Sequence, residues 1–226
     1  MDARQRLDSV RAQATITEIS NAQMEGKSRM AVQHTNRRGQ VYTLYEGRPK
    51  KGSPNYFFAR RPKPGVKPLE SIPEGYEIHE SPEPAQVFLR RIKPRLVTDA
   101  EVETVRRAVR ELAGLRIYIV DPEEKAIVVW TPMQDPGELE QFLQELGSYA
   151  TPDLMDKMTR GGTFHAMMRF VLLDGERRLF RADRWCFRGR IDNWIELEAS
   201  GKLGPLLQRF IPHLGKESFY DLPYLA

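Results

Sequence analysis

The sequence predicts an α+β fold of antiparallel hairpins with packed helices, in which a basic N-terminal β module precedes an α+β body. Three observations lead to this class. Short runs of β-branched and aromatic residues recur in pairs around turn-forming residues, which indicates hairpins and therefore antiparallel sheet. Apolar residues at three- and four-residue spacing predict helices between the hairpins. The excess positive charge is confined to one part of the chain.

The N-terminal part of the chain predicts an arm followed by hairpins. Residues 1–33 are polar with weak helical spacing, so we expect a helical or flexible arm. Residues 41–46 and 56–59 are rich in β-branched and aromatic residues, and the residues between them are turn formers. This pattern predicts a hairpin with a basic tip. The proline-rich passage 62–73 is expected to run extended, before two short strands at 76–78 and 86–89.

The body alternates helices and hairpins. We expect a helix that begins after Thr98 or Asp99 and ends at Gly114, followed by a hairpin of residues 115–120 and 126–130. Further predicted elements are helices from 135 and 151, a hairpin of 163–173 with 176–187, and a helix over 203–210. We divide the chain into an arm (1–33), a basic β-hairpin module (34–95) and an α+β domain (96–226).

The charge distribution predicts a polyanionic partner. Between Lys27 and Lys67 the chain has eleven lysines and arginines and one acid, Glu46, a net charge of +10. Residues 68–226 carry a net charge of −5, so a basic segment is attached to a mildly acidic body. Such clustering indicates a nucleic-acid footprint better than a high overall pI does.

The basic hairpin is therefore the candidate site. A two-stranded ribbon fits a DNA groove, arginine and lysine contact phosphates, and aromatic rings stack on single-stranded bases. The alternative is that the aromatic residues are core and the charges a solvated face, since each strand must bury one side. The expected nucleic-acid-binding residues are Arg37, Arg38, Arg48, Lys50, Lys51, Arg60 and Arg61, with Tyr42, Tyr56 and Phe58 for stacking.

Motifs for catalysis and cofactors are missing. The four histidines are far apart in sequence, and one cysteine excludes a zinc finger or ribbon. No glycine-rich loop joins a strand to a helix, and no Gly-x-Ser-x-Gly elbow occurs. We expect no cofactor, no metal and no catalytic residue. Turn acids such as Glu123 and Glu124 are more typical of solvated turns than of metal ligands.

Two features of the predicted hairpin of 163–173 with 176–187 have alternative interpretations. With Asp174 and Gly175 as a two-residue loop, His165 would pair with Arg184 and lie diagonal to Cys186, which suggests a nucleophile and its base. We favour a buried, unreactive cysteine. The arginines of this hairpin indicate local ion pairs, with a phosphate-binding face that includes Arg184 and Arg188 as the alternative.

These observations favour a non-enzymatic nucleic-acid-binding or accessory protein, with DNA or RNA as partner. One alternative is a protein–protein adaptor that docks through an aromatic C-terminal tail (Phe219, Tyr220, Leu222 and Tyr224). Another is a metal-dependent hydrolase or nuclease with acids gathered from distant loops. No apolar run approaches the roughly 18 residues that a membrane span needs. The single cysteine, the start without a signal pattern and the arginine-rich composition lead us to expect a cytoplasmic, bacterial protein.

Overall fold

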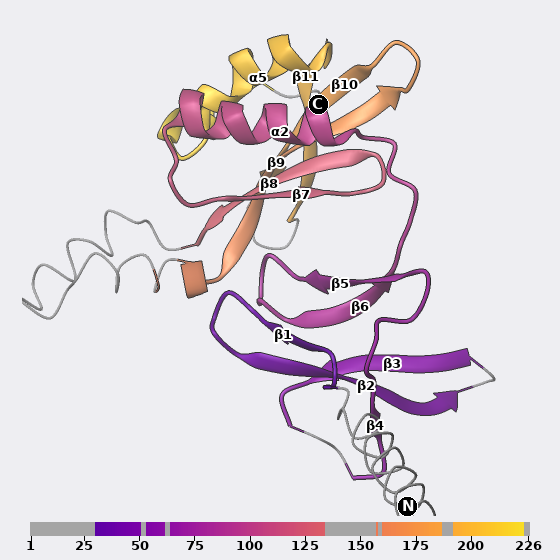
Figure 1. Ribbon diagram of the computed structural model, residues 1–226. Coiled ribbons are helices and arrows are strands. Elements are labelled where there is room, and N and C mark those ends of the chain that lie inside the picture. Colours follow the sequence, from indigo (N-terminus) through magenta and orange to yellow (C-terminus); the bar gives the residue numbers. More distant parts are fainter. Residues whose placement is uncertain are drawn as a thin grey trace, which may run out of the picture.

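The computed structural model describes residues 30–50, 53–61, 64–133, 157, 160–186 and 192–223, without the side chains of 48–50, 53, 54 and 198. In this part of the chain, helices pack on antiparallel sheets, which confirms the α+β class and the basic β module before the body. Figure 1 shows the two-stranded sheet between the two larger ones. Residues 1–29 of the predicted arm and the helix from 135 lie outside the described residues, whereas Gln33 at the end of that arm belongs to strand β1 (Gln33–Thr35). Of the segment after 151, residues 157, 160 and 161 are described, and they are helical. The domain division stays a prediction.

The first sheet is built around β2 (Val41–Lys50). β3 (Ser53–Ala59) pairs with one edge of β2, and β1 (Gln33–Thr35) and β4 (Lys67–Pro68) pair with the other. The predicted basic hairpin is confirmed by the antiparallel pairing of β2 with β3. β4 lies in the proline-rich passage and is short, as expected where proline lacks the N–H that a ladder needs.

The second sheet is the hairpin of β5 (Tyr76–Glu80) and β6 (Val87–Arg91), which confirms two further predicted strands. It packs against the first sheet, where the rings of Tyr56 and Tyr76 meet edge to face with centroids 5.4 Å apart. Val87 of β6 is buried, with 1% of its surface exposed. Because side chains alternate along β5 and β6, one face of the second sheet is directed toward the first sheet and the other toward the body.

The helix α2 (Asp99–Ala108) begins where the sequence predicts and ends earlier, at Ala108. Thr98 is its N-cap, and the Thr98 hydroxyl accepts from the backbone N–H of Glu101 while the Glu101 carboxylate accepts from that of Thr98. This reciprocal capping box satisfies two N–H groups that a helix start leaves open. A π-helical turn, η1 (Val109–Ala113), continues the helix to Gly114, whose φ of 71° suits a residue without a Cβ.

The third sheet has the strand order β11-β10-β9-β8-β7. Its strands are β7 (Ile119–Pro122), β8 (Ala126–Pro132), β9 (Phe164–Asp174), β10 (Leu179–Cys186) and β11 (Asn193–Gly201). β7 begins later than predicted, because residues 115–118 form the return from α2. β8 and β9 pair as far as Pro132 and Phe164, and the N–H of Met133 donates to the carbonyl of Thr163 at 2.8 Å.

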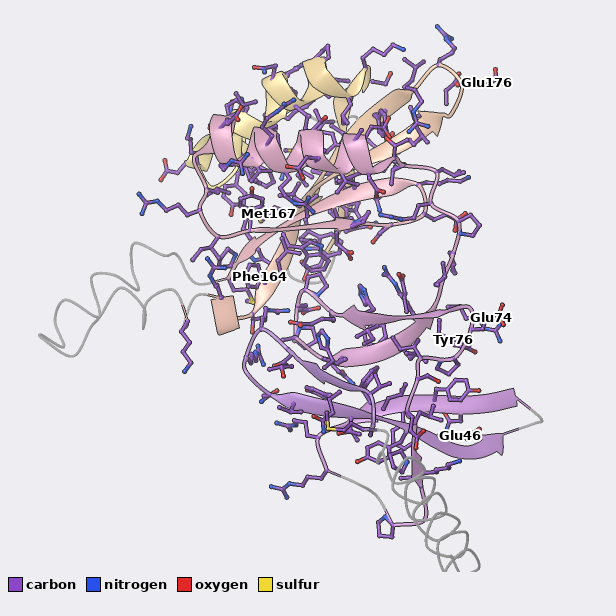
Figure 2. All side chains as sticks on the ribbon, viewed as in Figure 1. Glu46, Glu74, Tyr76, Phe164, Met167 and Glu176 are labelled. Carbon is purple, nitrogen blue, oxygen red and sulfur yellow. The ribbon has the colours of Figure 1, made fainter. Side chains whose placement is uncertain are left out.

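The core of the body lies between this sheet and the helices α2 and α5 (Leu203–Phe210), which cover one face (Figure 1). Ile127, Phe170 and Phe180 are fully buried there. A register shift between β8 and β9 lets the neighbours Met167 and Met168 both reach the core, where a regular strand would turn one of them away. Figure 2 labels Met167 at this point of β9.

The turn between β9 and β10 differs from the prediction. Four residues, 175–178, form the turn, and Arg178 adopts a left-handed φ of 49°. The Asp174 carboxylate accepts from the backbone N–H groups of Glu176 and Arg177, an Asx turn that a two-residue loop does not allow. Arg184 therefore pairs with Met168 and not with His165.

The C-terminal segment packs on its own domain. After α5 the chain forms two 3-10 turns, Ile211–His213 and Glu217–Phe219. Phe219 is 0% exposed and Leu222 is 6% exposed, and both belong to the core of the body. Of the predicted docking tail, Tyr220 is exposed and Tyr224 lies outside the described residues. None of the described helices is long and apolar enough to cross a bilayer.

Candidate nucleic-acid interface

The predicted basic residues lie at the two ends of the β2–β3 ribbon. Thr43 pairs with Ala59, so Arg60 and Arg61 lie at the end where the β1–β2 turn carries Arg37 and Arg38. The tip with Arg48, Lys50 and Lys51 is at the other end, where the side chains of 48–50 and all of 51–52 are outside the described structure. At a rise of 3.2–3.4 Å per residue, the ends of β2 are about 30 Å apart. The charges therefore form two groups.

Arg37 is part of the internal structure of the module. Its guanidinium donates to the Glu80 carboxylate at 2.9 Å and to backbone carbonyls of residues 81–83. The guanidinium also lies 5.0 Å from the ring centroid of Phe164. Its side chain is 15% exposed. Burial lowers the pKa of Arg37 and the charge of Glu80 opposes that shift. We therefore leave Arg37 out of the proposed interface.

Arg38 connects the module to the body. Its Nε donates to the carbonyl of Gly161 at 2.7 Å, and one terminal nitrogen donates to the hydroxyl of Thr163 at 3.3 Å. Both acceptors lie just before β9, so Arg38 links the β1–β2 turn to the start of that strand. Arg38 is nevertheless exposed.

Arg60, Arg61 and Lys67 are exposed cations that lie on strand β4 or directly after β3. Within the described residues, no hydrogen bond or ion pair joins their side chains to another group. Arg60 and Arg61 follow β3 directly, so the end of the strand fixes their backbone while their side chains extend into solvent. They are available for phosphate contacts in a way that Arg37 is not.

The predicted stacking residues lie on the packed face of the ribbon. Phe58 pairs with the fully buried Leu44, and Tyr56 pairs with Glu46, so both aromatic side chains share one face of the sheet. On this face Tyr56 contacts Tyr76 of the second sheet. Tyr42 belongs to the same face by alternation and donates to the Gln40 side chain at 3.4 Å.

The three rings are half-buried, and their face is occupied by neighbouring side chains. We therefore omit Tyr42, Tyr56 and Phe58 from the interface proposed below. The alternation of the strands had indicated in advance that some of these rings would be core.

Two further cations extend the basic surface near the hairpin tip. Arg91 and Lys93 are exposed, and no acid in the described structure pairs with them. Arg91 pairs with Tyr76 across the second sheet and its guanidinium lies 5.4 Å from that ring. Figure 2 shows Tyr76 on the same side of the molecule as Glu46 of β2. The sequence contained the signal, a basic run over residues 90–95, but it did not place that run beside the hairpin.

The other members of that run are ion-paired. Arg90 pairs with Glu77 at 2.7 Å, and Arg95 pairs with Asp99 at 2.9 Å. The exposed acids Glu46 and Glu74 also lie at this side of the molecule (Figure 2). Glu46 also pairs with Lys67 across β2 and β4, so the positive surface of the described residues is weakened there and is strongest at the end of β3.

Two arginines of the β9–β10 hairpin form the local ion pairs that the sequence favoured. Arg169 and Arg181 both donate to Asp183, which is fully buried. Arg184 is 5% exposed and donates to the carbonyl of Tyr220, so it is no part of an exposed phosphate-binding face. Arg188, the other residue of that alternative, lies outside the described residues.

The structure does not support the cysteine–histidine pair. Cys186 is buried, as favoured from the sequence, and the observed register differs from the one that placed it beside His165. His165 contacts the Thr131 hydroxyl at 3.1 Å across the β8–β9 pair. Burial lowers the pKa of His165, which keeps the imidazole neutral over a wider pH range.

Two carboxylates lie where the second sheet approaches the body. Burial raises the pKa of Asp121, and nearby Arg90 opposes this shift. Burial and the charge of Asp121 raise the pKa of Glu123. In the described ranges, no three histidine, cysteine, aspartate or glutamate side chains are grouped so that they could hold a metal ion.

Comparisons with known protein families, with curated proteins and with solved structures found no match to this chain.

Proposed function

We propose that this protein is a non-enzymatic nucleic-acid-binding or accessory protein whose N-terminal β module contacts phosphates. The observation that carries the proposal is the net charge of +10 between Lys27 and Lys67, on a chain that is acidic beyond it. Nucleic-acid affinity is dominated by such sequence-independent phosphate contacts. The partner is DNA or RNA.

The structure changes which residues we assign to the interface. Arg60, Arg61 and Lys67 have exposed side chains without acid partners in the described structure, which supports their role in phosphate contacts. Arg48, Lys50 and Lys51 remain in the proposal because of their place at the hairpin tip. Arg91 and Lys93 join them as a flank of the same surface. We place the protein in the bacterial cytoplasm, a reducing compartment compatible with one buried free cysteine.

The two alternative functions have less support. The adaptor hypothesis depended on an aromatic tail, and Phe219 and Leu222 of that tail are buried in the protein's own core. The hydrolase hypothesis needed acids gathered from distant loops, and Asp183 is instead enclosed by Arg169 and Arg181.

The test is fluorescence anisotropy with labelled double-stranded DNA, single-stranded DNA and RNA over a salt series. The variant Arg60→Ala/Arg61→Ala should bind more weakly, and its slope of log affinity against log salt should fall by roughly 0.7–0.9 for each lost contact. Arg48→Ala/Lys50→Ala/Lys51→Ala tests the tip in the same way.

The matched control is Arg107→Ala/Arg177→Ala, which removes two exposed arginines of the body and changes the net charge equally. Its salt slope should equal that of the wild type. Absence of binding to all three probes at low salt would overturn the proposal. An equal loss in the control would show that overall charge, and not the β module, determines the affinity.

A further inference from the structure

A cavity of about 610 Å³ lies at the C-terminal end of α2, on the body and away from the β2–β3 ribbon. Ligand pockets in proteins usually have volumes of about 300–1,000 Å³, so the size suits a small molecule. Its lining residues are Arg106, Arg110, Gly114, Leu115, Arg116, Tyr118 and Val120.

The fold explains why three arginines meet here. Arg106 and Arg110 are four residues apart and lie on one side of the helical segment. The π-helical turn ends at Gly114, whose left-handed conformation reverses the chain and brings Arg116 back past the helix end. Single π-helical turns occur frequently at functional sites. Val120 of β7 is buried beneath the return, so the cavity occupies the angle between helix and sheet.

Tyr118 forms a fixed apolar wall. Its hydroxyl donates to the carbonyl of Arg106 at 2.9 Å, at the point where α2 passes into the π-helical turn. This bond holds the ring at the helix end. The lining therefore combines an aromatic and an aliphatic side chain with guanidinium groups.

The cavity is strongly positive. Its lining contains three arginines and no acid. Arg106 pairs with Glu103 at 2.6 Å, whereas Arg110 and Arg116 are exposed and make no ion pair or hydrogen bond with the described residues. The partial negative charge at a helix C-terminus is about half an elementary charge, which two unpaired guanidinium groups exceed.

We propose that this cavity binds a small organic phosphate of about nucleotide size. The phosphate would be held by Arg110 and Arg116, because planar guanidinium forks match phosphate oxygens and a dianion neutralises both charges. The rest of the molecule would lie against Tyr118 and Leu115. The site is separate from the proposed nucleic-acid interface, since it shares no residue with it.

Isothermal titration calorimetry of the full chain tests this inference with four probes: adenosine monophosphate, inorganic phosphate, adenosine and citrate. We expect saturable binding of adenosine monophosphate, with inorganic phosphate weaker. Adenosine, which lacks the charge, should bind at least about tenfold more weakly, since hydrogen bonds to charged groups are worth more than one factor of ten. Tighter binding of citrate than of either phosphate probe would overturn the assignment in favour of carboxylates.

The test variant is Arg110→Ala/Arg116→Ala, and the control Arg107→Ala/Arg177→Ala removes the same charge outside the cavity. The test variant should lose at least about tenfold in affinity for adenosine monophosphate, while the control keeps it. Failure of both phosphate probes to bind the wild type, or unchanged binding in the test variant, would overturn the proposal. A test variant that loses nucleic acid but binds adenosine monophosphate like the wild type would also overturn it, by assigning these arginines to the larger interface.

Discussion

Arg37 and Glu80 are joined through both the side chain and the backbone of the arginine. The guanidinium donates to one carboxylate oxygen at 2.9 Å, and the Arg37 N–H donates to both oxygens at 3.2 and 3.3 Å. Arg37 lies in the β1–β2 turn and Glu80 ends β5, so the pair connects the first two sheets. A residue that the sequence offered as a phosphate ligand is thus a structural link.

Loss of the Glu80 charge should destabilise the protein. In Glu80→Gln the guanidinium of Arg37 keeps its buried position but loses its counter-charge. Breaking a buried ion pair lowers the free energy of unfolding by about 3–5 kcal/mol, whereas breaking an exposed ion pair lowers it by under about 1 kcal/mol. For this partly exposed pair we expect a loss of about 2 kcal/mol. Urea unfolding measures it. Glu83→Gln, at an exposed neighbouring acid, is the control and should stay within about 0.5 kcal/mol of the wild type.

Substitution of Asp183 should destabilise the protein more than substitution of Glu80 does. Asp183 is 0% exposed and accepts from Nε of Arg169 and Nε of Arg181, each at 2.7 Å. Asp183→Asn leaves two guanidinium groups without their carboxylate, and we expect a loss of about 3 kcal/mol in the free energy of unfolding. Glu196→Gln removes a half-exposed partner of Arg181 and should cost under about 1 kcal/mol. Equal stability of the two variants would contradict the assigned role of burial.

The raised pKa of Asp121 predicts that the stability of the protein depends on pH. Burial raises the pKa of the Asp121 carboxyl, so the folded protein binds this proton more readily than the unfolded chain does. Asp121 therefore lowers the stability of the folded protein increasingly as the pH rises from the ordinary aspartate pKa through the raised pKa. Asp121→Asn should raise the urea midpoint at pH 7.5, and the gain should shrink as the pH falls toward the ordinary pKa. Asp221→Asn, at an exposed site, is the control for the loss of one carboxylate. A constant gain for Asp121→Asn at every pH would contradict the explanation.

Local signals in the sequence predicted local structure well. Thr98 and Gly114 mark the two ends of a helical segment because capping and left-handed conformations depend on a few neighbouring residues. The β2–β3 hairpin followed in the same way from two aromatic runs and a turn-rich tip. The register of β9 against β10 was harder to predict. The dipeptide Asp174-Gly175 favours a two-residue loop, but the Asx turn of Asp174 and the left-handed Arg178 lengthen it.

The candidate site was only partly predictable, because the role of an arginine depends on acids far away in the sequence. Arg37 and Arg60 look alike in the sequence, yet Glu80 engages one and no described acid engages the other. The cavity at Arg110 and Arg116 had no sequence signal at all. Its arginines are brought together by a π-helical turn and a chain reversal, neither of which hydrophobic periodicity reveals.

The bond from Met133 to Thr163 makes β8 and β9 a hairpin whose connection is closed at its base. At the other end of the pair, the N–H of Leu172 donates to the carbonyl of Lys125 at 2.7 Å. The register of β8 against β9 is therefore held at both ends. A slip by one residue would have to break both bonds, and it would turn the buried side chains of these strands to the opposite face of the sheet.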